Sequence, residues 1–203
     1  MDHLTDLHLD ALSEVFNIGA GRAAASLSEI VAEEVKLSVP ALEFRKCAEF
    51  NEKVLLLDQS QLGVVRQHFS GALNAEASLL FTEDSALEIM RDMMGSQISI
   101  EELAEFEQEA MCELGNIILN ACLSAISDML GMQMESSLPS YTVCNADELI
   151  QGIVDTPDQE YIMILHIDLE IERRAVNGKL IFLFSSSSLT TLRERIDDFL
   201  NNI

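Results

Sequence analysis

The chain has 203 residues, of which 48% are hydrophobic, and its 12 Lys and Arg against 35 Asp and Glu give a formal net charge of −23. This composition is that of an ordinary globular protein, long enough for one sizeable core or two fused halves. The negative charge excludes a non-specific contact with nucleic-acid phosphates and makes anionic membranes repulsive. We therefore expect neither a nucleic-acid nor a membrane partner, and we expect a monomer.

The N-terminal sequence and the cysteines both bear on where in the cell the protein is found. No basic segment followed by an apolar stretch opens the chain, and we expect no apolar run to approach the roughly 20 residues of a membrane span. The four cysteines, Cys47, Cys112, Cys122 and Cys144, form no Cys-x-x-Cys pair and show no metal-ligand spacing with a histidine. We expect a cytoplasmic protein with free thiols and no metal or cofactor of its own.

Hydrophobic periodicity and turn residues predict the elements. In the first half we expect a helix over 4–34, a strand over 35–41 ending at Pro40, strands over 54–57, 64–69 and 77–81, and a helix over 84–94. In the second half we expect a helix over 98–130, a strand over 133–143 interrupted by Pro139, a polar loop or helical turn over 145–152, strands over 161–172 and 175–184, and a helix over 189–200. Asn177-Gly178 is expected to form the tight turn of the last hairpin.

A polar pattern on the first long helix returns once, in register, on the second. Asp10, Glu14 and Asn17 follow one another at spacings of four and three, and Glu109, Glu113 and Asn116 repeat those spacings. At 3.6 residues per turn each triplet lies on one helical face. An apolar stripe suited to burial occupies the opposite face: Leu9, Leu12, Phe16, Ala23, Leu27 and Ile30 on the first helix, and Met111, Ile118, Cys122, Ile126 and Met129 on the second.

The repeat extends over the whole chain. Pro40 and Pro139 stand at the same distance after Asn17 and Asn116, and each half begins with a long helix, continues through strands and ends with a shorter helix. We predict a single domain of residues 1–203 made of two repeats, about 1–96 and 97–203. The fold class is α/β, more closely α+β, with a pseudo-two-fold internal repeat. One largely antiparallel sheet carries the two long motif helices on one face.

The duplicated triplets with their prolines resemble the CheC/CheX/FliY family of chemotaxis phosphatases. Two motifs in about 200 residues resemble the CheC type, since CheX-type members carry one motif per chain and FliY-type members add a further domain. The resemblance covers essentially the whole chain. It departs from the family pattern at Glu109, where the family commonly has Asp or Ser.

The resemblance implies an enzyme that removes the phosphoryl group from phospho-aspartate on a CheY-type response regulator. Catalytic roles are implied for Glu14, Asn17, Glu113 and Asn116: each asparagine amide positions the attacking water, and each glutamate pairs with a basic residue of the regulator. Mg2+ is expected on the partner's receiver domain. Asp10 and Glu109 are expected to help docking. A CheD-type deamidase is a further implied partner, with Asp147 and Glu148 as candidate contacts.

Three alternatives remain open. The chain could be a non-enzymatic adaptor of the same fold that binds the phosphorylated regulator or a CheD-type deamidase. Glu109 and Glu113 could ligate a metal, although no histidine joins them. Cys112 lies next to Glu113, but nothing basic adjoins it in the sequence to activate a thiolate.

Overall fold

The computed structural model describes residues 4–51, 61–94, 100–171 and 174–202. The first half contains α1 (Asp6–Val31), β1 (Val35–Lys46), the 3-10 helix η1 (Cys47–Glu49), β2 (Leu62–Gly71), β3 (Ala75–Thr82) and α3 (Glu83–Met94). The second half contains α4 (Ile100–Leu130), β4 (Met134–Ser136), β5 (Ser140–Cys144), α5 (Ala146–Val154), β6 (Tyr161–Ile171), β7 (Arg174–Phe184) and α6 (Ser186–Asn201). The expected strand over 54–57 lies outside the described residues.

Strands from both halves form one antiparallel sheet. Its order is β1-β6-β7-β3-β2-β4, with β5 also paired to β2. Each half therefore donates its first strand to the other half, β1 to β6 and the β4–β5 pair to β2, while β3 and β7 meet at the centre. The register repeats as well: Ala41 lies opposite His166 as Ser140 lies opposite Arg66. The predicted fold class is confirmed.

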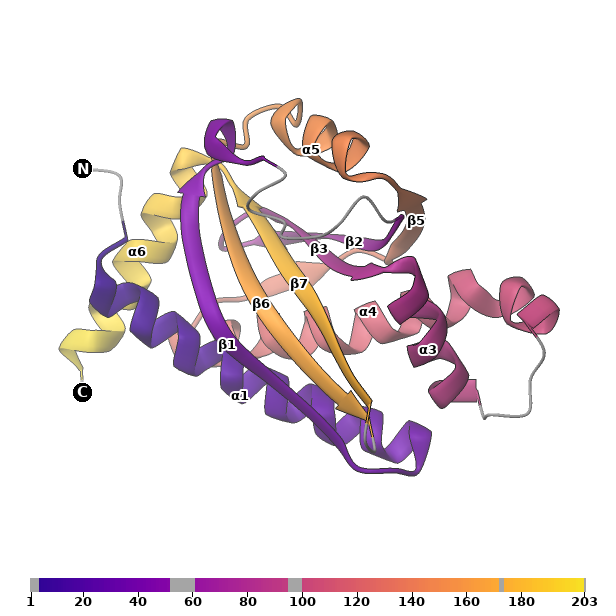
Figure 1. The fold of residues 1–203 in the computed structure, drawn as a ribbon. Coiled ribbons are helices and arrows are strands. Elements are labelled where there is room, and N and C mark those ends of the chain that lie inside the picture. The colour runs from indigo at the N-terminus through magenta and orange to yellow at the C-terminus, as the bar shows by residue number, and fades with distance from the viewer. Residues whose placement is uncertain (1–3, 52–60, 95–99, 172–173, 203) are drawn as a thin grey trace.

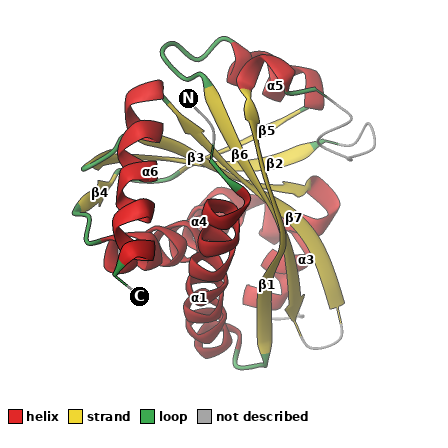
Figure 2. Cartoon of the chain, turned by 90° about the vertical axis from the view of Figure 1, so that its left-hand side faces the viewer, coloured by secondary structure: helices red, strands yellow, loops and turns green. Residues whose placement is uncertain are grey.

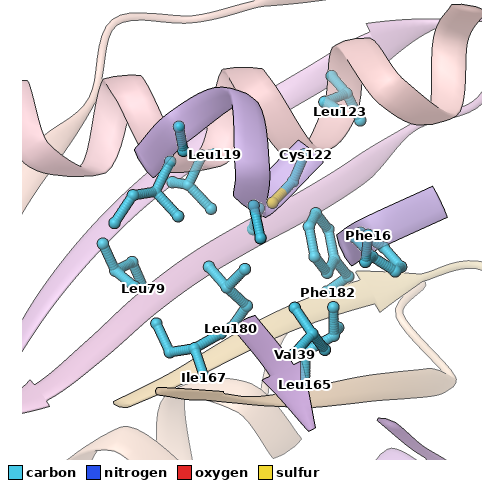
Figure 3. Close-up of a cluster of buried hydrophobic side chains, with 14 of the residues drawn as sticks. Phe16, Val39, Leu79, Leu119, Cys122, Leu123, Leu165, Ile167, Leu180 and Phe182 are labelled. Carbon is cyan, nitrogen blue, oxygen red and sulfur yellow. The ribbon is translucent and has the colours of Figure 1, made fainter. Parts of the chain in front are cut away.

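Helices cover both faces of the sheet unequally (Figure 1). The larger apolar cluster joins buried residues of α1, α3, α4 and α6 to one face, whereas α5 and η1 pack a smaller cluster onto the other face. Figure 2 shows α1 and α4 on the same side of the sheet. Figure 3 shows the larger cluster, where Phe16 of α1 lies 5.5 Å from Phe182 of β7 between ring centroids.

The two motif helices touch each other directly. Gly19 makes this possible, because a Cβ at Gly19 would lie 2.7 Å from the Cα of Cys122. An ion pair of 2.8 Å between Arg22 and Asp128 also joins the two helices. Within α4, residues Phe106–Leu130 are long and apolar enough to span a membrane, contrary to expectation, but half of the apolar window is buried inside the protein. We interpret α4 as a core helix.

Several boundaries differ from prediction. β1 continues past Pro40 to Lys46, because a register shift between Ser38 and Ala41 leaves the proline outside the ladder at the sheet edge. Asn177 and Gly178 do not form a turn; they lie inside β7, paired with Asp168 and Ile167. A Cβ at Gly178 would lie 2.5 Å from the ring of Phe81, so close packing explains this glycine.

Candidate functional site

The polar face of α1 is exposed as predicted. Thr5 starts the helix with a capping box that includes His8, and Asp10, Glu14 and Asn17 then stand on the solvent side. Between them and the sheet, Leu12 and Phe16 are at most 1% exposed. The apolar stripe holds except at its last position, because Ile30 is 46% exposed near the end of the helix.

The amide of Asn17 binds the backbone of Val39. Its Oδ1 accepts from the Val39 N–H at 3.0 Å, while its Nδ2 donates to the Val39 carbonyl at 3.2 Å and to the Ser13 carbonyl at 3.0 Å. The register shift before Ala41 removes Val39 from the β1–β6 ladder, so Asn17 supplies the partners that the ladder does not. The spacing between Asn17 and Pro40 thus has a structural cause in the first half.

The second triplet is arranged differently. Glu109 and Glu113 are exposed on α4, whereas Asn116 is half-buried. Asn116 Oδ1 accepts from Asn120 Nδ2 at 2.7 Å and lies 3.4 Å from Gln67 Nε2 of β2. No described residue accepts a hydrogen bond from Asn116 Nδ2.

The loop beside Asn116 leaves the helix open. Leu138 occupies the place in the second half that Val39 has in the first, but Leu138 is 90% exposed and Val39 is 4% exposed. A cavity of about 770 Å³ lies there, lined by Phe106, Glu109, Ala110, Cys112, Glu113, Asn116, Leu138 and Pro139. The sequence-predicted glutamates and asparagine of the second site therefore meet at one cavity.

Known proteins resemble this chain in sequence and in fold. A search against models of protein families gave no match. The chain is 28% identical over 140 residues to the CheY-P phosphatase CheC of Bacillus subtilis, an alignment that spans 66% of each protein. The fold matches that of Thermotoga maritima FliY with a TM-score of 0.76 and 22% identity, covering 97% of this chain and 98% of the other.

In sequence and in fold, the chain is similar to members of the CheC/CheX/FliY family. A more distant fold match is to a CheX–CheY–BeF3–Mg complex from Borrelia burgdorferi, with a TM-score of 0.52, 14% identity and coverage of 85% of this chain and 97% of the other. In that structure a CheX protein is bound to a CheY protein. At this identity the match shows the fold alone.

Two residues at this candidate site, Gln67 and Leu138, were not predicted from the sequence, and neither was the role of a third, Asn120. Gln67 left a signal, because it interrupts the apolar face that Val65 and Phe69 define on β2. Leu138 left none, because an exposed leucine in a strand segment looks like any other apolar position. Asn120 lies on the predicted polar face one turn after Asn116, but its contact with Oδ1 required the structure.

The remaining candidates lie elsewhere or carry no special chemistry. Asp147 and Glu148 are on α5, across the sheet from the motif helices, and Glu148 closes the capping box of α5 with Asn145. Burial raises the pKa of the Cys112 thiol, which does not favour a thiolate nucleophile. Within the described ranges no three His, Cys, Asp or Glu side chains gather as a metal site.

Proposed function

We propose that this chain is a phosphatase that hydrolyses phospho-aspartate on a CheY-type response regulator, and that the helix faces of α1 and α4 carry the two sites. The observation that supports this proposal most directly is the cavity at which Glu113, Asn116 and the exposed Leu138 meet. The relative named CheY-P phosphatase CheC supports the substrate class.

The proposed chemistry needs little from the phosphatase itself. An acyl phosphate has a good leaving group, so a water placed in line and stabilised charge suffice, with no covalent intermediate on this chain. The Nδ2 hydrogens of Asn116 have no acceptor within the described part of the chain and can hold a water or a phosphoryl oxygen. At the first site, Asn17 Oδ1 retains one lone pair beside its bond from Val39 for the same purpose.

The glutamates suit recognition. Glu14 and Glu113 project from exposed helix faces of a chain with net charge −23, so a basic side chain near the regulator's phosphorylation site is a complementary partner. Asp10 and Glu109, one turn earlier on each helix, extend the same acidic surface toward the partner. Mg2+ would belong to the receiver domain, because this face offers an open set of carboxylates rather than a closed cage.

A second partner would use another surface of the protein. We propose that Asp147 and its neighbours on α5 dock a CheD-type deamidase on the sheet face opposite the two sites, which leaves both asparagines free to act. We further propose that the protein works as a monomer in the cytoplasm.

The alternative is a non-enzymatic adaptor. A pure adaptor would bind the phosphorylated regulator without accelerating phosphate release.

The test is phosphate release from a CheY-type receiver that has been charged with acetyl phosphate in Mg2+. The wild-type chain should accelerate release catalytically, with many receivers turned over per molecule. A matched control is Asp147→Asn, which removes a charge from α5 on the other face and should leave turnover unchanged. If the chain bound the phosphorylated receiver but did not accelerate phosphate release, the adaptor function would be favoured.

A further inference from the structure

Gln67 is a polar side chain in an apolar place. It is 1% exposed on β2 between Val65 and Phe69, which are both 0% exposed. Its Nε2 donates to the Ser137 carbonyl at 2.7 Å and lies 3.4 Å from Asn116 Oδ1, while its Oε1 is buried without a partner in the described part of the chain. A buried acceptor left without a hydrogen bond lowers stability, so the fold alone does not favour glutamine here.

The other half of the chain shows that the fold accepts an apolar residue at this place. Ala41 and Ser140 occupy the same place in the two repeats, and they lie opposite His166 and Arg66. His166 therefore corresponds to Arg66, and the next residue on each strand corresponds as well, so that Ile167 stands in the place of Gln67. Ile167 is 1% exposed within the apolar cluster of Figure 3. The amide of Gln67 therefore has a use that is particular to the second site.

Two backbone carbonyls fix how the amides around Asn116 are oriented. Asn120 Nδ2 donates to the Asn116 main-chain carbonyl at 2.9 Å, so the atom that Asn120 turns toward the Asn116 side chain is a donor. In the same way, the Ser137 carbonyl requires the Nε2 end of Gln67. Both neighbours thus present N–H groups, and Asn116 must turn Oδ1 toward them.

We propose that Gln67 is a positioning residue of the second site, which with Asn120 holds the Asn116 amide so that Nδ2 is left for the partner. This inference rests on the proposed function and deepens it. The first site has neither residue. Ile167 stands in the place of Gln67, and Gly21, which is 99 residues before Asn120, stands in the place of Asn120; Val39 engages Asn17 instead. The two sites are therefore built to present different atoms, a fixed donor in the second and a partly used acceptor in the first.

The test is Gln67→Leu in two backgrounds. In Asn17→Ala, where only the second site works, we expect the kcat for receiver dephosphorylation to fall by about ten- to a hundredfold with KM unchanged, because orientation is lost and docking is not. In Asn116→Ala, where the second site is already disabled, the substitution should cause no further fall. An equal fall in both backgrounds would indicate general damage to the fold and would overturn the assignment, as would no fall in either.

Gln67→Glu provides a variant of the same shape with a pH readout. A buried carboxyl beside two carbonyl oxygens should have a raised pKa, and only its protonated form can donate a hydrogen bond. In the Asn17→Ala background, second-site activity of Gln67→Glu should therefore rise relative to its parent as the pH falls. A pH profile identical to that of the parent would contradict the proposed contact.

One measurement does not depend on phosphatase activity. The side-chain NH2 signals of Asn116, assigned by their loss in Asn116→Ala, should shift in the NMR spectrum of Gln67→Leu without any receiver present. Unshifted signals would overturn the positioning role itself. If the signals shift but the wild-type chain releases no phosphate from any receiver, the proposed function fails while the geometric inference stands.

Discussion

Asn17 binds Val39 through both polar groups of that residue's backbone, at 3.0 Å to the N–H and 3.2 Å to the carbonyl. Val39 is 4% exposed and lies outside the strand ladder, so no other described partner replaces Asn17. Asn116 has no such duty: the amides of Asn120 and Gln67 keep backbone carbonyl partners without it. The two asparagines of the repeat thus differ in what their loss should do.

The first prediction concerns stability. Asn17→Ala should lower the free energy of unfolding by about 1–3 kcal/mol, because it leaves buried backbone groups unpaired. Asn116→Ala should lower it by less than about 1 kcal/mol, because its neighbours remain hydrogen-bonded and alanine is a good helix former. Chemical denaturation monitored by circular dichroism measures both values. Equal losses in the two variants would contradict the assigned difference.

The second prediction concerns activity and has the opposite order. Asn116→Ala should remove the larger share of receiver dephosphorylation, because Asn116 lies at the cavity with an unused donor. Asn17→Ala should retain most of the activity at a temperature where it is folded. The double variant should fall by about 100-fold or more, the scale expected for lost orientation of a reactant. Full activity in a folded double variant would refute the proposed role of both amides.

The third prediction concerns the exposed side chain of Leu138. Leu138→Ser should raise the Kd for the phosphorylated receiver by about ten- to a hundredfold, because an apolar side chain buried on binding contributes about 1.5–3 kcal/mol. The matched control is Val154→Ser, since Val154 is 48% exposed but lies on α5 across the sheet. Titration calorimetry with a stably activated receiver measures both. An equal change in the two variants would exclude Leu138 as a specific contact.

The fourth prediction concerns Gly178. Gly178→Ala should destabilise the protein by about 1–3 kcal/mol or more, because the added Cβ would lie 2.5 Å from Phe81 and 2.8 Å from the Leu80 carbonyl. Gly152→Ala on α5, where nothing lies within 4 Å of the added atom, should be neutral or stabilising by up to about 1 kcal/mol. Thermal unfolding compares the two. Equal effects of the two substitutions would contradict the close packing of Gly178 against Phe81.

The fifth prediction concerns acid stability. Burial alone would raise the pKa of Glu43, but hydrogen bonds from Arg45 and His166 outweigh it and hold that pKa below its usual value. A carboxyl with a lowered pKa stabilises the fold above its unfolded pKa, and this contribution disappears as the pH falls through the folded value. Glu43→Gln should therefore cost about 0.5–1 kcal/mol at neutral pH and less in acid. A cost independent of pH would show that shape, not charge, is involved.

Local sequence patterns were enough to predict the two long helices, the polar stripe on each and the fold class, because a period of 3.6 residues and its in-register repetition can be read along the chain. The same patterns indicated the family resemblance that the sequence and fold comparisons support. They did not determine the length of β1 or the place of Gly178, because both depend on which strands become neighbours. The pattern of Asn177-Gly178 favours a turn locally, and the ring of Phe81 across the sheet gives the glycine another reason.

The difference between the two repeated motifs comes from tertiary contacts. In sequence, Asn17 with Pro40 and Asn116 with Pro139 are the same signal. After the halves exchange strands, Asn17 meets the backbone of Val39, whereas Asn116 meets the side chains of Gln67 and Asn120 beside a cavity. A hydrogen bond depends on atoms brought together from distant parts of the chain, so identical spacings along two helices can lead to two chemically different sites.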